Sequence, residues 1–210
     1  MKEHDDFFKF CSDNFETTYW IPGNHEYYHS DFEDKRGAFF EKLRDNIFLV
    51  NDYAATIENV RLIFSTLWTK VKPNHRTAIE RSMNDFHLIR FNGRRLTCKD
   101  IDDEHIKSLD FIKNELLQEL PGVKKIVVTH HVPTFINYPP EYFGQILNEA
   151  FAVNLTRMIV ESGPDYWIYG HHHKNVPEFL IGKTKLVTNQ LGYVQHNENI
   201  QFDPAKVLEL

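Results

Sequence analysis

Hydrophobic positions along the chain recur with two different periods. Between 103 and 120 they recur at intervals of three and four, which predicts an amphipathic helix that Pro121-Gly122 ends. Further helices are predicted at 7–14, 31–45 and 149–161, and one helix within an irregular stretch at 76–90. Short β-rich or continuously apolar runs predict strands at 17–21, 47–50, 53–58, 60–66, 125–129, 166–169, 178–181 and 184–188. Because helices and strands are interleaved, we expect a layered α/β or α+β fold.

Three of the apolar strands run directly into polar clusters. The first leads to Gly23-Asn24-His25-Glu26, the second to Thr129-His130-His131-Val132-Pro133, and the third to Gly170-His171-His172-His173. Functional loops of α/β proteins gather at the carboxyl ends of strands. We therefore expect these three segments to form one shared site.

The polar clusters contain residue types that bind metal ions. Five of the chain's 12 histidines lie in two of them. Neutral imidazole binds Zn, Fe, Ni and Mn, and an amide oxygen suits the harder ions. In an extended loop His171 and His173 would point the same way and His172 would point away, while Gly23 and Gly170 would let the backbone approach an ion closely. Asn24-His25 alone is more typical of a turn, and His130-His131 alone is more often without function. Three consecutive histidines can be a solvated surface run, so it is the occurrence of the three clusters together that indicates a metal site.

Composition and charge narrow the classes of function. The 210 residues are predicted to form one domain over 1–210, and a net charge of −6 argues against duplex nucleic acid but not against a phosphoester substrate. No apolar run reaches 18 residues and the acidic start lacks a secretory signal, so we expect no membrane partner. Cys11 and Cys98 form no paired motif, which favours a reducing, cytoplasmic location. The oligomeric state is left open.

In this order, GNHE at 23–26, HH at 130–131 and GHHH at 170–173 resemble the signature of the calcineurin-like metallophosphoesterases. The resemblance covers roughly residues 17–190. It implies a metallophosphoesterase-like fold, in which a layered β-sandwich is flanked by helices. It also implies a metal-binding hydrolase, either a phosphatase or a phosphodiesterase, in which two metal ions activate a hydroxide that attacks phosphorus. Substrate identity, monoester or diester preference, and the choice among Mn, Fe, Zn and Ni stay open.

The same resemblance implies a role for each matching residue. The implied metal ligands are Asn24, His130 and His171 for the second ion and His173 for the first. His25 would be catalytic, stabilising charge on the phosphoryl group or protonating the leaving oxygen. Glu26 is given no direct role, and His131 and His172 are interpreted as packing residues or residues behind the ligands.

Two motifs of the family pattern, DxH and GDxxD, have no counterpart before Gly23. They would supply an Asp and a His to the first metal, an Asp that bridges both metals, and the Asp partner of His25. The sequence is therefore interpreted as N-terminally incomplete, with Met1 an internal methionine and the first strands of the fold missing. We expect two divalent metal ions in the complete domain but one or none in this chain. We also expect little or no hydrolysis, and an unpaired apolar sheet edge that favours pairing with another chain.

Two other functions stay open at this point. One is a non-catalytic phosphate-binding or protein-binding relative that retains one metal site. The other is a mono-metal hydrolase outside the family, in which Asn24, His130, His171 and His173 would not converge. The aromatic segments at 27–28 and 138–143 are candidates to line a substrate pocket, and are equally consistent with loop packing.

Overall fold

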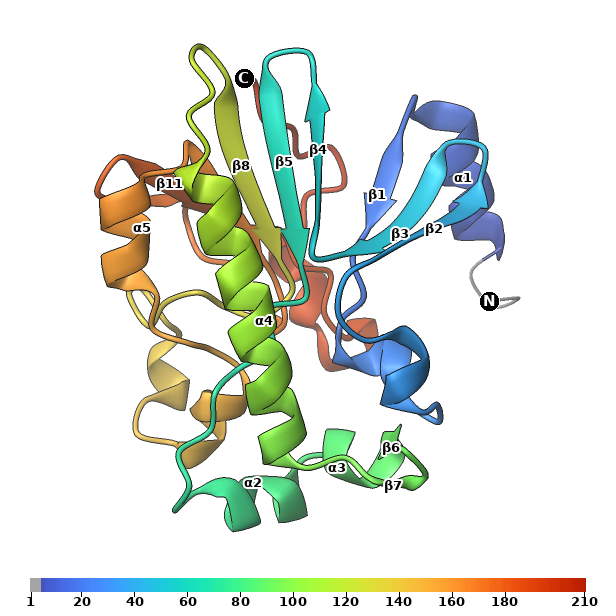
Figure 1. Ribbon diagram of the computed structural model, residues 1–210, viewed down its shortest axis with the longest axis vertical. Helices are drawn as coiled ribbons and strands as arrows, with labels where there is room; N and C mark the ends of the chain where they lie inside the picture. Colours follow the sequence, from blue (N-terminus) through green and yellow to red (C-terminus); the bar gives the residue numbers. More distant parts are fainter. Residues whose placement is uncertain (1–4) are drawn as a thin grey trace.

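The computed structural model describes residues 5–210, and its largest element is a six-stranded mixed sheet (Figure 1). In order across the sheet, its strands are β10 Phe179–Ile181, β11 Thr184–Val187, β9 Tyr166–Tyr169, β8 Lys124–Thr129, β5 Val60–Ser65 and β4 Tyr53–Ile57. The four inner strands run parallel, and the two edge strands run antiparallel to their neighbours. Ile126 and Val127 of β8 are both buried, as expected for an apolar strand covered on both faces.

A second sheet of three strands lies beside the first (Figure 1). Its order is β1 Thr18–Trp20, β3 Ile47–Asn51 and β2 Phe39–Arg44. The strands predicted at 17–21, 125–129 and 166–169 are confirmed as β1, β8 and β9, and each of them pairs in parallel with a neighbouring strand. Within the described residues β1 pairs with β3 alone and is therefore an edge strand. The Tyr19 ring of β1 stacks on Phe64 of the larger sheet, with 4.8 Å between ring centroids.

Helices cover the sheets and close the lower end of the molecule in Figure 1. α4 Cys98–Leu117 and α5 Thr156–Ser162 pack on the large sheet, and α1 Asp5–Asn14 packs on the small one. Beyond the carboxyl ends of β5 and β8 lie α2 Arg76–Ser82, α3 Asp85–Leu88 and the hairpin of β6 Arg90–Phe91 and β7 Arg94–Arg95. The 3-10 helices are η2 Asn24–Tyr27, η3 Phe32–Lys35, η4 Pro140–Tyr142, η5 Ile146–Ala150, η6 Val194–His196 and η7 Glu198–Gln201. These elements form the mixed α/β architecture that the interleaved pattern predicts.

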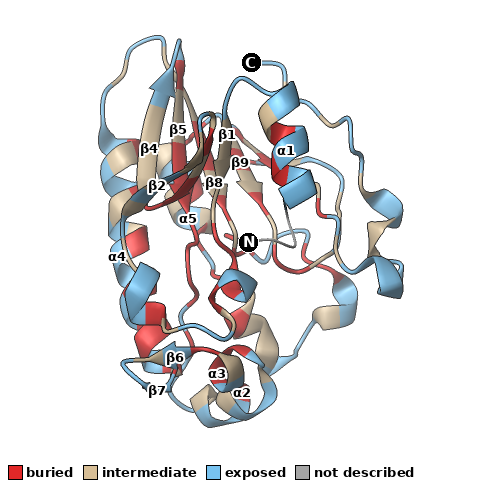
Figure 2. Cartoon of the chain, turned by 90° about the vertical axis from the view of Figure 1, so that its right-hand side faces the viewer, coloured by how far each residue is buried: buried red, intermediate tan, exposed pale blue. Residues whose placement is uncertain are grey.

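Buried side chains form two main apolar clusters. In the first, Ile112 of α4 and Ile159 of α5 pack on Val127 and Trp167 of the large sheet. The second cluster, around Trp68, joins η2, η3, α2, α3 and the start of α4. Figure 2 shows the buried positions along β5 and β8, whereas α1 and α4 are buried on one side only. The second cluster therefore provides a packed base for the loops at the carboxyl ends of the strands.

The helix predicted at 31–45 is wrong. The structure has the short 3-10 helix η3 there, followed by strand β2. Gly37 adopts a positive φ of 67° between the two elements, which interrupts helical geometry. Phe40 then stacks on Phe48 of the neighbouring strand at 5.0 Å, so its apolar surface is used in a cross-strand pair.

The helix predicted at 149–161 is only partly correct. α5 begins at Thr156, and the preceding segment contains η5 and a bridge between Ala152 and Val132. The Val132 amide donates to the Phe151 carbonyl at 3.2 Å, which holds this segment extended against the loop that follows β8. The 76–90 stretch contains two short helices, where one helix is predicted.

Within residues 5–210, none of the helices combines the length and apolar composition that crossing a bilayer requires. Both cysteines are buried and free, which agrees with the absence of a paired cysteine motif.

Candidate metal centre

Loops at the ends of three parallel strands bring the sequence-predicted polar clusters together. Asn24 begins η2 just after β1, His130 follows β8, and His171 follows β9. The ring nitrogen Nε2 of His130 lies 3.1 Å from Asn24 Oδ1 and 2.9 Å from His171 Nδ1. Asn24 and His171 are buried. Segments 106 and 41 residues apart in the sequence therefore meet at one point.

His131 belongs to the same cluster of side chains. One ring nitrogen from each of His130, His131 and His171 lies within 4.8 Å of the others. The Nδ1 of His131 lies 3.0 Å from the Thr66 carbonyl, which can only accept a hydrogen bond. This contact puts the proton on Nδ1 and leaves the Nε2 lone pair available to a metal. Sequence reasoning misses this because consecutive side chains alternate in a strand, whereas β8 ends at Thr129.

The side-chain amide of Asn24 is oriented by a carboxylate absent from the sequence-predicted site. Asn24 Nδ2 donates to Asp85 Oδ1 at 2.7 Å, and the Tyr28 hydroxyl donates to the same oxygen at 2.8 Å. The amide oxygen of Asn24 consequently faces His130. Burial raises the pKa of Asp85, while the bonds from Asn24 and Tyr28 act to lower it. Asp85 stands in a four-residue helix with no recognisable motif, so only its spatial position reveals its role.

Gly23 makes room for the His130 ring. A Cβ added at Gly23 would lie 2.7 Å and 2.8 Å from the two ring nitrogens of His130, far inside any normal contact. A Cβ at Gly170 would meet only the His130 carbonyl oxygen, at an ordinary 3.6 Å. The backbone at Gly23 therefore lies close to the His130 ring, and Gly170 shows no comparable contact. The predicted close approach of backbone to a metal ion stays a prediction.

Electrostatics keep the clustered imidazoles neutral. Burial, with the neighbouring His131, holds the pKa of His130 well below its ordinary range, and burial does the same for His171. Burial lowers the pKa of His131 to about 4. Neutral imidazole is the form that binds a metal ion, because the ligand lone pair is then free.

The loop after β9 does not have the extended shape considered from the sequence. His171 and His173 both have positive φ angles, 77° and 56°. His172 is buried, and its Nδ1 accepts a hydrogen bond from Gln190 Nε2 at 3.0 Å. His173 Nδ1 lies 2.9 Å from Glu198 Oε2, and His173 is not part of the three-histidine cluster.

His25 is exposed beside the cluster. Its ring lies 4.6 Å from the Tyr28 ring, and the Tyr193 hydroxyl lies 3.4 Å from its Nε2. His173 packs against the same Tyr193, with ring centroids 4.7 Å apart. Tyr193 therefore contacts both His25 and His173.

One cavity of about 360 Å³ contains most of these side chains. Asn24, His25, His171 and His173 line it, and His130 contacts Asn24 and His171 behind its surface. Of the aromatic residues at 27–28 and 138–143, some line the cavity and at least one is packed in the interior. The residues Tyr28, Tyr138 and Tyr142 line the cavity, whereas Tyr27 is buried beside Phe32 and Trp68.

The donor set is suited to a divalent ion. Asn24 Oδ1 can only accept, so a proton on His130 Nε2 would be shared between this oxygen and His171 Nδ1. His171 Nε2 is buried and has no hydrogen-bond partner within residues 5–210. Three neutral imidazoles and one amide oxygen are ligands for Zn, Fe, Ni or Mn. Asn24, His130, His131 and His171 could therefore hold a metal ion between them.

Comparison with known proteins finds a sequence relative and several structural neighbours, of which two are described here. An uncharacterized protein of Acanthamoeba polyphaga mimivirus, L509, is 31% identical over 223 residues, covering 97% of this chain and 77% of its own length. The phosphopantetheinyl hydrolase PptH from Mycobacterium tuberculosis aligns with a TM-score of 0.62 and 13% identity, over 94% of this chain and 76% of its own. A second solved structure aligns with a TM-score of 0.48 and 16% identity, and the chain spans 64% of its length.

A family model also matches most of the chain. The sequence model of the calcineurin-like phosphoesterases matches residues 2–175, a span that includes Asn24, His130 and His171. The PptH likeness, at 13% identity, supports the fold alone. The chain therefore belongs to the calcineurin-like phosphoesterase family.

Proposed function

We propose that this protein hydrolyses a phosphoester at a metal centre held by Asn24, His130 and His171, with His131 as a fourth donor. The observation that supports this most directly is the meeting of Asn24, His130 and His171 at 2.9–3.1 Å at the ends of separate strands. Family membership agrees with metal-dependent phosphoester hydrolysis and favours it over the non-catalytic and unrelated mono-metal alternatives.

The residues of the chain would divide the work between binding and proton transfer. Asp85 fixes the Asn24 amide, and Thr66 fixes the His131 ring, so the ligand atoms are oriented before an ion binds. Bound divalent ions would supply a Lewis acid and a hydroxide near neutral pH. His25, exposed in the cavity beside Tyr193, is placed to deliver a proton to the leaving oxygen.

A second ion is the finer part of the proposal. His173 would be its ligand from this part of the chain, and Glu198 would orient it through Nδ1 at 2.9 Å, leaving Nε2 for the metal. The bridging Asp of the family pattern has no counterpart before Gly23 in the sequence. We therefore propose one tightly held ion in this chain, with weaker hydrolysis than a two-ion centre supports. A single domain and a cytoplasmic location stay predictions.

Metal content and hydrolysis measured together test this function. The protein is purified without chelator, its metal content is measured by mass spectrometry, and p-nitrophenyl phosphate and its bis ester are offered with added Mn²⁺. We expect close to one bound ion per chain and slow turnover of at least one ester.

The matched variants are His130→Ala and His87→Ala. His87 is exposed, and within residues 5–210 its ring is hydrogen-bonded only to the Arg81 carbonyl, at 3.0 Å, so its loss should leave the centre intact. His130→Ala should lose both bound metal and turnover, whereas His87→Ala should keep both. Equal metal content and equal turnover in the two variants would refute the proposed centre.

A further inference from the structure

The cavity extends well beyond the histidines, and aromatic rings line much of the remainder. Phe151 lies on the His171 ring at 4.6 Å, so the aromatic lining begins directly at the metal ligands. Tyr138 and Tyr142 pack edge to face at 6.1 Å, and both line the cavity. Flat rings at a cavity wall favour a ligand that is itself flat, because every planar base or aryl group presents a face for stacking.

The lining of this cavity is poor in cations. Among the described residues that line it there is no Lys and no Arg. Its one carboxylate, Glu198, is already engaged by His173 Nδ1 at 2.9 Å and by the Tyr193 amide at 2.6 Å. A charged group of a ligand that lies in this cavity, outside the metal centre, would therefore lose hydration without gaining a partner of opposite charge. That loss costs binding free energy. A ligand with a single phosphate at the metal and no further charge fits best.

Three side-chain amides supply free hydrogen-bonding groups on the same lining. The side chain of Asn84 makes no hydrogen bond within residues 5–210. Gln145 and Asn148 each donate from nitrogen to a backbone carbonyl, at 3.0 Å and 2.5 Å, which leaves their amide oxygens available. Amides recognise the edges of nucleobases, which present donors and acceptors in the ring plane.

Resting on the proposed function, we propose that the substrate is a phosphoester with one phosphate and a planar, uncharged, hydrogen-bonding ring, the chemistry of a nucleoside monophosphate. The phosphate would lie at the metal centre, and the ring would stack among Phe151, Tyr138 and Tyr142. The Asn84, Gln145 and Asn148 amides would contact the ring edge. These aromatic and amide residues, rather than the histidines, would determine specificity.

Equilibrium binding to the metal-loaded protein tests this without depending on turnover. Inorganic phosphate, ribose 5-phosphate, AMP and ADP are titrated calorimetrically into the Mn²⁺-loaded chain. We expect AMP to bind at least tenfold more tightly than ribose 5-phosphate, and ADP to bind no more tightly than AMP. Ribose 5-phosphate binding as tightly as AMP, or ADP binding tenfold more tightly than AMP, overturns the inference while the proposed function stands. If none of the four phosphates binds, the proposed function fails and this inference fails with it.

Two pairs of variants assign the preference to named side chains. Tyr142→Leu should remove most of the difference in affinity between AMP and ribose 5-phosphate. Tyr166→Leu, on β9 and outside the cavity, should keep that difference.

Asn84→Ala should weaken AMP binding three- to tenfold and leave ribose 5-phosphate binding unchanged. Asn114→Ala, an exposed position on α4, is its control. Because Asn84 is exposed and unbonded, this variant should fold even if Tyr142→Leu does not. Unchanged AMP binding in Asn84→Ala and in folded Tyr142→Leu would contradict the proposed subsite.

Discussion

At the residue scale, the candidate metal centre depends on a missing side chain as much as on the candidate ligands. Gly23 lies against the His130 ring, and the missing side chain is what allows that ring to reach Asn24 and His171. The sequence pattern of a glycine before Asn-His indicates close approach, but not which group approaches. The structure identifies that group as the ring of His130, a candidate metal ligand in the loop that follows β8.

We predict that Gly23→Ala displaces the His130 ring and empties the centre. A Cβ at 2.7–2.8 Å from both ring nitrogens requires a shift, and the ring is confined between Asn24, His131 and His171. The expected result is a loss of at least tenfold in metal affinity, measured by competition with a chromophoric chelator. Gly170→Ala, whose Cβ meets nothing closer than 3.6 Å, should retain wild-type affinity. Equal affinities in the two variants would contradict the packing argument.

The candidate site was predictable from the sequence where the chain itself carries a motif. Asn24, His25, His130, His171 and His173 could be singled out because each stands at the end of an apolar strand. Asp85 and Thr66 could not, because their contribution is a hydrogen bond to a ligand made across the fold. His131 was interpreted as a packing residue because neighbouring side chains in a strand point to opposite faces. That rule does not apply to His130 and His131, since the strand ends at Thr129.

At the element scale, α4 holds the loop that supports His131. His105 Nδ1 contacts the Trp68 carbonyl, and Asp102 accepts from the Val71 amide at 2.8 Å, so the helix fixes the loop after β5 at two points. The Trp68 ring in turn lies 5.3 Å from the His131 ring. The helix is read readily from its three–four periodicity, whereas the polar bonds on its buried face have no such signature.

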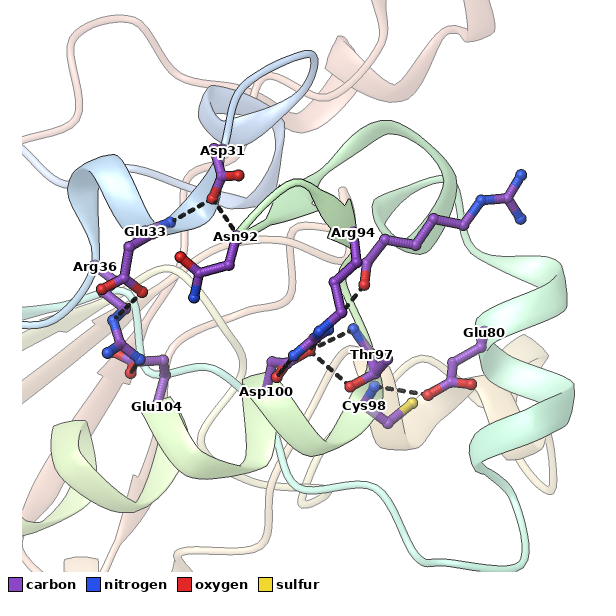
Figure 3. Close-up of polar contacts among 11 residues, drawn as sticks. Asp31, Glu33, Arg36, Glu80, Asn92, Arg94, Thr97, Cys98, Asp100 and Glu104 are labelled. Atoms are coloured by element: carbon purple, nitrogen blue, oxygen red, sulfur yellow. Dashed lines mark hydrogen bonds and ion pairs between the residues drawn. The ribbon is translucent and has the colours of Figure 1, made fainter.

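The first turn of α4 is secured by a buried carboxylate (Figure 3). Asp100 accepts from the Thr97 amide at 2.8 Å and from both terminal nitrogens of Arg94 at 2.7 Å. Burial alone would raise the pKa of Asp100, but the bonds from Arg94 and Thr97 hold it below its ordinary value. Asp100 is therefore ionised at neutral pH and joins the β6–β7 hairpin to the helix start.

We predict that Asp100→Ala lowers the free energy of unfolding by about 2–4 kcal/mol, since a capping bond and a bidentate charge-assisted pair are lost together. Urea denaturation followed by circular dichroism measures this. Asp103→Ala, an exposed position on the same helix, should change stability by less than about 0.5 kcal/mol. A similar, small effect in both variants would show that the hairpin and helix start are held by other contacts.

At the scale of the whole molecule, the presence of apolar strands covered on both faces follows from the sequence, and the partition into two sheets does not. Continuous apolar runs such as Ile126-Val127-Val128 predict strands covered on both faces, as observed. The separate three-stranded sheet depends on β2. The apolar pattern of Phe32, Phe39, Phe40 and Leu43, which begins in η3 and continues through β2, also fits a helix. The positive φ of Gly37 and the Phe40–Phe48 contact favour the strand over the helix. The Phe40–Phe48 contact joins two strands, so a local sequence pattern does not reveal it.

Buried histidines should also make the folded state of the whole molecule sensitive to acid. Burial lowers the pKa of His172 to about 4, and His173 beside it acts in the same direction. The ordinary value is about 6.5. Because the folded state resists protonation, the unfolded chain binds more protons at intermediate pH. The contribution of His172 to stability is therefore fully present above about pH 6.5 and is lost as the pH falls towards 4.

We predict that the free energy of unfolding of the metal-free protein falls between pH 7 and pH 5, with His172 accounting for roughly 2 kcal/mol of the fall. Burial raises the pKa of Asp52 and Asp85, and these carboxyls oppose the trend because their folded forms take up protons more readily. Their effect cancels when the wild type is compared with His172→Gln. In chemical denaturation at both pH values, the variant should show a smaller fall than the wild type. An equal fall in the two proteins would mean that the His172 ring can be protonated without disturbing the Gln190 contact or the loop that carries His171 and His173.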